Sequence, residues 1–323
     1  MVKSSIFKQR VIVLYRSITK EYQIVIPLII VFCLASIITP NFFDTGNLIN
    51  VLRQIAVLSI ISIGATLVIY TGGIDLSVGS VMALVGVFIA NGIKTGTPLP
   101  LLIISGMLFG MVIGCVNGLF IINFTVPAFI VTLATMTIGR GFILLWTGGS
   151  NVSELNNQSF LFLGRGSVLG IPFPVIILIL LFALGCFMLS YTKLGREIYA
   201  IGSNVKASKV AGINIKRVEL TVYVLAGLLA AIGAIIDTSR MNTVTPMYGK
   251  GIEFNCVAAV ILGGASLEGG EGHLLNTLFG AALLGIISNA LNLIGISSYW
   301  GQIAKGVILI LAILLYSNRK QKY

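Results

Sequence analysis

The segment Thr192–Arg217, TKLGREIYAIGSNVKASKVAGINIKR, organises the rest of the chain. It contains six Lys and Arg residues and a single acid, Glu197. The apolar runs Ile171–Tyr191 and Val218–Asp237 flank it, and each has about the length that crosses a membrane. A basic polar segment between two such runs is typical of a cytoplasmic loop, because positive charge is enriched on that side of the bilayer.

Within this segment, Asn204–Gly212 predicts a short helix. Asn204 can cap its first turn, the small or apolar side chains Ala207, Val210 and Ala211 share one side, and Gly212 can end it. A helix at the cytoplasmic surface offers a docking site for another protein. The alternative is that the six basic charges only fix the orientation in the membrane.

Composition identifies the class of protein. Of 323 residues, 57% are hydrophobic and 10% are charged, whereas soluble domains carry about 25% charged residues. The net charge of +11 comes from residues that flank apolar runs, so the orientation bias explains it and no nucleic-acid partner is expected. The four cysteines are isolated in or beside apolar runs, which indicates neither a disulfide framework nor a metal site.

We expect an all-α polytopic membrane protein with a single transmembrane domain, residues 1–323, and both termini in the cytoplasm. The ten expected spans are Ile24–Thr39, Ile55–Tyr70, Ser80–Asn91, Leu101–Ile122, Ala128–Thr147, Ile171–Tyr191, Val218–Asp237, Phe254–Gly263, Leu274–Leu293 and Gln302–Tyr316. The third and eighth are shorter than the ~20 residues of a straight crossing, so they are tilted, half-length or broken. Ten crossings place fourteen basic residues in the cytoplasm and five outside.

Two glycine-rich breaks interrupt the apolar sequence, and both fit the pattern Gly-Gly-x-x-Leu-x-x-Gly. The crossing count places them on the same side of the membrane. Irregular backbone at membrane depth survives only against protein or a watery cavity, so the breaks indicate a translocation pathway; ordinary tight turns are the alternative. The candidate pathway residues are Gly72, Gly73, Asp75, Ser77 and Gly79 in the first break, and Gly263, Gly264, Gly269 and Gly270 in the second.

Few other features carry chemistry. Gly106, Gly110, Gly114 and Gly118 form a small-residue stripe that predicts close helix packing. Arg140 lies within a span and needs a partner; Asp75 is either that partner or a helix cap. The sequence contains no phosphate-binding loop, catalytic triad or metal-ligand spacing, so we expect neither an enzyme nor a cofactor bound by this chain.

Five sequence blocks, in order along nearly the whole chain, resemble the permease subunits of bacterial ATP-binding-cassette importers for simple sugars, the ribose type. The blocks are Ile38–Phe43 (ITPNFF), Thr71–Ser80 (TGGIDLSVGS), Thr192–Gly202 with Ala211–Lys216, Ala258–Gly272 and Asn289–Tyr299. Glu268 and Glu271 among the glycines of the second break are a departure.

The resemblance implies a homodimer in the bacterial inner membrane. Two copies of a cytoplasmic ATPase, which use the ATP, would dock on it, and an external binding protein would deliver the sugar. It also implies that residues 192–217 are the coupling segment, with Arg196, Asn204, Lys206, Ala207, Lys209, Ala211 and Gly212 as the docking residues.

Two functions remain open. The first is a permease subunit of an ATP-driven importer for ribose or a related pentose, although permeases of this kind also serve hexoses, furanosyl compounds and nucleosides. The second is a stand-alone secondary carrier or channel for a small polar solute. The basic segment and the lack of an acidic relay within the spans favour the first.

Overall fold

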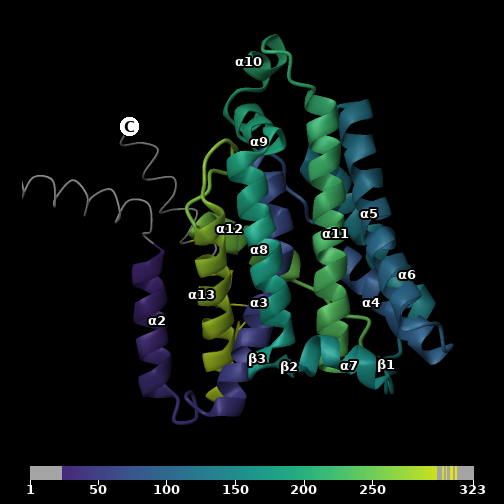
Figure 1. Ribbon diagram of the computed structural model, residues 1–323, viewed down its shortest axis with the longest axis vertical. Coiled ribbons are helices and arrows are strands. Elements are labelled where there is room, and N and C mark those ends of the chain that lie inside the picture. Colours follow the sequence, from purple (N-terminus) through teal and green to yellow (C-terminus); the bar gives the residue numbers. More distant parts are fainter. Residues whose placement is uncertain (1–23, 297–299, 302, 304–305, 308–309, 311–323) are drawn as a thin grey trace, which may run out of the picture.

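The computed structural model describes residues 24–296, 300–301, 303, 306–307 and 310. Long helices dominate and run roughly parallel to one long axis (Figure 1). The elements are α2 (Val25–Ile38), α3 (Thr45–Tyr70), α4 (Val78–Lys94), α5 (Leu99–Phe124), α6 (Ala128–Thr147), β1 (Val152–Ser153), α7 (Gln158–Arg165), β2 (Ser167–Val168), β3 (Ile171–Pro172), α8 (Phe173–Tyr191), α9 (Lys193–Ser203), α10 (Val205–Val210), α11 (Ile215–Met241), β4 (Thr243–Val244), α12 (Ile252–Leu262) and α13 (Leu274–Leu293).

Six of the described helices are long and apolar enough to cross a membrane, namely α3, α5, α6, α8, α11 and α13. Three shorter apolar helices, α2, α4 and α12, coincide with the expected first, third and eighth spans. The chain is therefore a multi-pass membrane protein. The expected tenth span, Gln302–Tyr316, and the basic terminal segments lie largely or wholly outside the described residues.

Several helix bounds differ from the sequence prediction. The second span was expected from Ile55, but α3 begins at Thr45, where the Asp44 side chain accepts a hydrogen bond from the Asn47 amide. The helix α11 likewise extends beyond Val218–Asp237 at both ends. The polar stretch before α8 contains α7 and three two-residue strands, so the fold is not purely helical. These strands pair as β1 with β4 and β2 with β3, both antiparallel.

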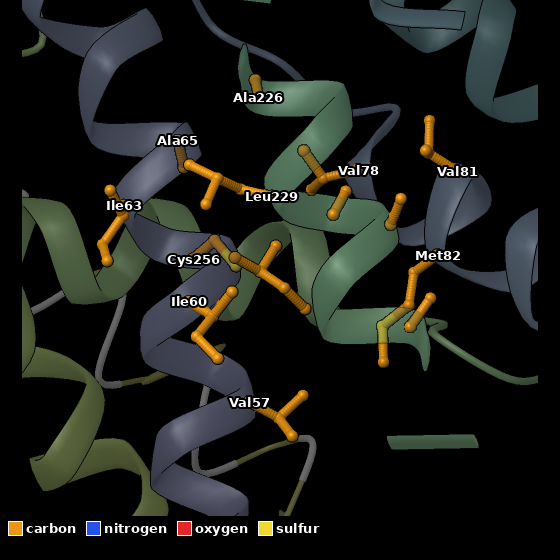
Figure 2. Packing of buried hydrophobic residues seen from close by; sticks show 14 of the residues in the cluster. Val57, Ile60, Ile63, Ala65, Val78, Val81, Met82, Ala226, Leu229 and Cys256 are labelled. Carbon is orange, nitrogen blue, oxygen red and sulfur yellow. The ribbon is translucent and has the colours of Figure 1, made fainter. Parts of the chain in front are cut away.

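The core lies along α3, which is apolar on all sides and is buried from Ala56 to Tyr70. Helices α8, α11, α12 and α13 pack against it, and Figure 2 shows Ile60 of α3 beside Cys256 of α12. By contrast, only 17% of the apolar window of α6 is buried, against 78% for α3. Most apolar side chains on α5, α6 and α8 are therefore not buried within the protein, as is expected of helices that face lipid.

Three glycines of the predicted small-residue stripe, Gly110, Gly114 and Gly118, form the contact between α5 and α11, and the fourth, Gly106, packs on α4. A Cβ atom built on Gly110 would lie 2.5 Å from the Gly227 carbonyl oxygen, and one built on Gly114 would meet the Tyr223 carbonyl oxygen. Such distances leave no room for a side chain, so the glycines bring the two backbones into direct contact. The prediction of close packing is confirmed.

The two ends of the bundle carry different polar structures. The helices α9 and α10 lie at one end, and α7 with β1–β3 lies at the other (Figure 1). At the α7 end, Arg165 Nε donates a 2.8 Å hydrogen bond to the Arg240 carbonyl oxygen, and Arg240 pairs with Asp237 at 2.9 Å. Arg53 also donates to the Arg165 carbonyl oxygen. Three basic residues expected outside the cell thus gather at the end opposite the basic segment.

Candidate translocation and docking site

The two glycine-rich breaks meet each other in space. The Gly270 amide donates a 3.0 Å hydrogen bond to the Tyr70 carbonyl oxygen at the end of α3. A Cβ atom on Gly269 would lie 2.7 Å from the Gly72 nitrogen, and one on Gly72 would lie 3.0 Å from the Glu268 carbonyl oxygen. The prediction that both breaks lie on the same side is confirmed, and the structure adds that they are in contact.

The first break is a non-helical segment from Thr71 to Ser77, in which Thr71, Asp75 and Ser77 are buried and Gly72 is exposed. Asp75 is 5% exposed, and its Oδ1 accepts hydrogen bonds from the Ser77 amide at 2.8 Å and the Ser77 hydroxyl at 2.6 Å. Ser77 itself occupies the N-cap position of α4. The proposed role of Asp75 as the helix cap is therefore wrong in detail: Asp75 holds the residue that precedes the helix.

Side chains of α5 and α6 satisfy the polar groups of the first break. Asn117 Nδ2 donates to the Ser77 hydroxyl at 2.9 Å, and the Thr135 hydroxyl donates to Asn117 Oδ1 at 2.6 Å. The Thr132 hydroxyl bonds the Ile74 carbonyl oxygen and the Leu76 amide, both at 3.1 Å. Irregular backbone inside a membrane requires such partners. The hydrogen bonds from Asn117 and Thr132 to the first break were not predicted from the sequence. The available signal for Asn117 was a polar amide next to Gly118, within the glycine stripe of an apolar span.

Arg140 does not pair with Asp75. Its Nη1 donates a 2.6 Å hydrogen bond to the Tyr248 carbonyl oxygen, and the charged group acting on it is Glu253. Tyr248 lies in the irregular segment before α12, and Glu253 lies in the first turn of α12. The groups that interact with Arg140 therefore come from a part of the chain at least 108 residues away. The alternative that assigned Asp75 as partner is wrong.

Glu253 marks a contact between the N-terminal turns of α4 and α12. It is 3% exposed, and its Oε1 accepts from the Gly251 amide at 3.1 Å. A Cβ atom on Gly79 would meet Glu253 Oε2, and that oxygen has no hydrogen-bond partner within the part of the chain that the structure describes. The amino ends of two helices favour a negative charge between them. Glu253 was not predicted from the sequence, although an acid at the start of a short apolar span is a signal for such a site.

The second break is locally folded as turns. The Gly269 amide donates to the Ser266 carbonyl oxygen at 3.1 Å, and the Ser266 amide donates to the Glu271 carbonyl oxygen at 3.2 Å. Gly263 packs directly on the backbone of Asn276 in α13. The reading of this segment as a tight turn is confirmed, and the segment also contacts the first break; its place in a translocation pathway stays a prediction.

The predicted short helix is confirmed as α10. The Asn204 side chain accepts a 2.9 Å hydrogen bond from the Ala207 amide. Gly212 has φ +80°, and the bonds from Gly212 N to Lys209 O (3.1 Å) and from Ile213 N to Ser208 O (3.0 Å) close the helix. This is a Schellman motif, which needs a residue without Cβ strain at that position.

The outer surface of α10 is uncovered. Ala207 and Ala211 are exposed, Val210 is 91% exposed, and Ser208 is the residue buried beneath them. The cations Lys206 and Lys209 of α10 are exposed, and so is Arg196 of α9. The residues Asn204–Gly212, which we predict to be docking residues, therefore form a capped helix with exposed small apolar side chains and exposed Lys206 and Lys209.

The helix α9 was not predicted. Its residues Ile198 and Ile201 are fully buried, whereas Lys193 and Arg196 are exposed. The basic residues on one side of α9 made this sequence resemble a polar loop. The apolar side of the helix is recognisable only in the structure, where Ile198 and Ile201 are buried. This helix connects α8 directly to α10.

Comparison with known proteins identifies the family. Residues 47–313 match the family model described as the permease component of branched-chain amino acid transport systems. The chain belongs to this family of transport permeases. The resemblance found in the sequence is thereby confirmed.

Close relatives carry sugar-transport names. The chain is 41% identical over 304 residues to the ribose import permease protein RbsC of Escherichia coli strain K12, covering 93% of this chain and 94% of the relative. It is 43% identical over 289 residues to RbsC of Bacillus subtilis, covering 89% and 90%. It is 32% identical over 342 residues to the xylose transport system permease protein XylH of Escherichia coli, covering 87% of each. No solved structure matches the chain.

Proposed function

We propose that this chain is the transmembrane permease subunit of an ATP-driven importer, and that ribose or a related pentose is its substrate. The family match and the similarity to two ribose import permeases over nearly the full length support this proposal. The lower identity to a xylose permease favours ribose within the pentoses. The chain is a non-catalytic subunit of the bacterial inner membrane, and a separate cytoplasmic ATPase subunit hydrolyses ATP.

The single observation that carries the coupling role is the shape of α10. The backbone groups at both ends of α10 are hydrogen-bonded, by the Asn204 cap and by the Schellman motif, whereas Ala207, Val210 and Ala211 are exposed. Small side chains let a partner approach closely, and Lys206 and Lys209 complement acidic residues on it. We assign the segment 192–217 as the ATPase-docking element, on the cytoplasmic side.

The translocation pathway follows the two breaks. In the first, Asp75 and Ser77 belong to a hydrogen-bonded chain that continues through Asn117 to Thr135 across three elements. Polar side chains and broken backbone inside a membrane are characteristic of transport routes. A second permease copy, an external sugar-binding protein and membrane lipid complete the proposed assembly, and the outward-facing apolar helices α5, α6 and α8 suit the last of these.

The docking role is tested by adding bulk to α10. Ala207→Trp should leave the permease in the membrane at normal level but prevent co-purification of the ATPase and abolish ATP-dependent ribose uptake. Gly212→Trp is less informative, because φ +80° strains any side chain there. Ile37→Trp, at a 79% exposed position on α2, is the matched control. Normal ATPase binding and uptake in Ala207→Trp would show that α10 is not the docking element.

The alternative, a stand-alone carrier, is tested separately. The purified permease is reconstituted in vesicles without the ATPase and the binding protein, and labelled ribose uptake is measured. We expect no uptake above that of protein-free vesicles. Uptake by the permease alone would contradict the importer assignment.

A further inference from the structure

The last turn of α9 lies against both glycine-rich breaks at once. Asn204 alone separates this turn from α10, and the Asn204 side chain caps that helix. The docking helix is thus connected to the breaks by one short helical segment. Tyr199 and Gly202 are the two residues of α9 that make the contacts described below.

Tyr199 contacts one residue beside each of the two glycine-rich breaks. Its hydroxyl donates a 3.1 Å hydrogen bond to the Gly272 carbonyl oxygen, which follows the second break. Its ring lies 5.1 Å from the ring of Tyr70, the fully buried residue that precedes the first break. A tyrosine hydroxyl is protonated at neutral pH, so Tyr199 can donate this hydrogen bond, and burial raises the pKa of its phenol further.

Gly202 sits directly on the hydrogen bond that joins the two breaks. A Cβ atom built there would meet the Tyr70 carbonyl oxygen and the Gly270 nitrogen, which are the acceptor and donor of that bond. A Cβ atom on Gly270 would in turn lie 2.5 Å from the Ser203 nitrogen. Three backbone segments therefore touch without intervening side chains.

Direct contact between backbones leaves little room for one segment to move without displacing the other. Packed protein interiors transmit a displacement because they contain few voids, whereas long side chains can absorb it by changing rotamer. An ordinary helix–helix contact would include such side chains. Helix α9 therefore cannot move towards the breaks unless the Tyr70–Gly270 region moves with it, and the Tyr199–Gly272 hydrogen bond resists movement away from them.

We propose that Tyr199 and Gly202 are positioning residues that pass a displacement of the docking segment to both breaks together. This inference rests on the proposed function, since it assumes that an ATPase displaces α10. Tyr199 secures α9 to the segment after the second break, and Gly202 allows α9 to rest on the bond between the breaks. Movement at α10 then alters the first and second breaks as one unit.

The test measures how many ribose molecules enter per ATP hydrolysed, using the full complex with its ATPase and binding protein in vesicles. Gly202→Ala and Tyr199→Leu should retain the bound ATPase and its ATP hydrolysis while ribose imported per ATP falls about threefold or more. Tyr199→Phe keeps the ring contact and loses only the hydrogen bond, so its ratio should lie between those of Tyr199→Leu and the wild type. Gly141→Ala, at an open position on α6, and Tyr191→Leu, at a 76% exposed position, are the matched controls.

The outcomes separate this inference from the proposed function. An unchanged ratio in Tyr199→Leu and Tyr199→Phe would overturn it, and so would a fall in uptake that only follows the amount of bound ATPase. If Gly202→Ala does not reach the membrane, the two Tyr199 variants decide the matter. A wild-type complex without ATP-dependent uptake would instead contradict the proposed function.

Discussion

The Gly270 amide donates a 3.0 Å hydrogen bond to the carbonyl oxygen of Tyr70, and this bond joins two breaks that are far apart in the sequence. Tyr70 ends α3, and Gly270 lies in the turns before α13. The two breaks, which share the pattern Gly-Gly-x-x-Leu-x-x-Gly, therefore lie next to each other in the fold. A transport step that opens one break must change or break the contact with the other.

Close packing of α5 on α11 predicts a large effect from a small substitution. Gly114→Ala places a methyl group against the Tyr223 backbone, and backbone cannot move aside as a flexible side chain can. Overpacking of this kind costs about 1–3 kcal/mol. Thermal unfolding of the purified permease in detergent should therefore occur at a lower temperature. Gly141→Ala, which meets nothing within 4 Å, should unfold like the wild type; equal midpoints for the two variants would contradict the packing argument.

Asp75 should matter as a hydrogen-bond acceptor more than as a charge. Asp75→Asn keeps an Oδ1 oxygen for the Ser77 amide and hydroxyl, so assembly and much of the transport should remain. Asp75→Leu leaves the buried Ser77 groups without that acceptor, at about 1–3 kcal/mol for each unsatisfied group. We expect a sharp loss of folded permease, measured by size-exclusion chromatography in detergent. Normal assembly of Asp75→Leu together with a changed choice of sugar would indicate a substrate contact instead.

The sequence was sufficient to locate the apolar helices and α10, because apolar runs, the Asn204 cap and the Gly212 stop are local signals. It was not sufficient to find α9, since the basic side of that helix obscured the buried Ile198 and Ile201. Asn117 and Glu253 were missed for a different reason. A single polar residue in an apolar run becomes significant only through distant partners, here Ser77 and Arg140, and those contacts depend on the tertiary fold.

The charge of Glu253 should be needed chiefly because Arg140 is present. Glu253→Gln keeps an oxygen for the Gly251 amide but removes the negative charge that acts on Arg140. A charge left without its counterion in a buried setting destabilises the folded state. We therefore expect Glu253→Gln to lower the unfolding temperature, and the double variant Glu253→Gln with Arg140→Gln to recover part of the loss. The four proteins of this cycle give the coupling directly, and strictly additive effects would show that the two groups act independently.

Orientation in the membrane is tested at two exposed positions on opposite ends of the bundle. Val210 in α10 is 91% exposed and Leu169 beside β2 is 97% exposed, so a cysteine at either site is accessible to a reagent on its own side. In a background without the four native cysteines, a membrane-impermeant maleimide should label Leu169→Cys in intact cells. The same reagent should label Val210→Cys only after the membrane is permeabilised, because the basic segment belongs in the cytoplasm. A reporter fused after Tyr323 should also indicate a cytoplasmic terminus if ten spans are present. Labelling of Val210→Cys in intact cells would place α10 outside, where a cytoplasmic ATPase cannot reach it, and the docking assignment would fail together with the topology.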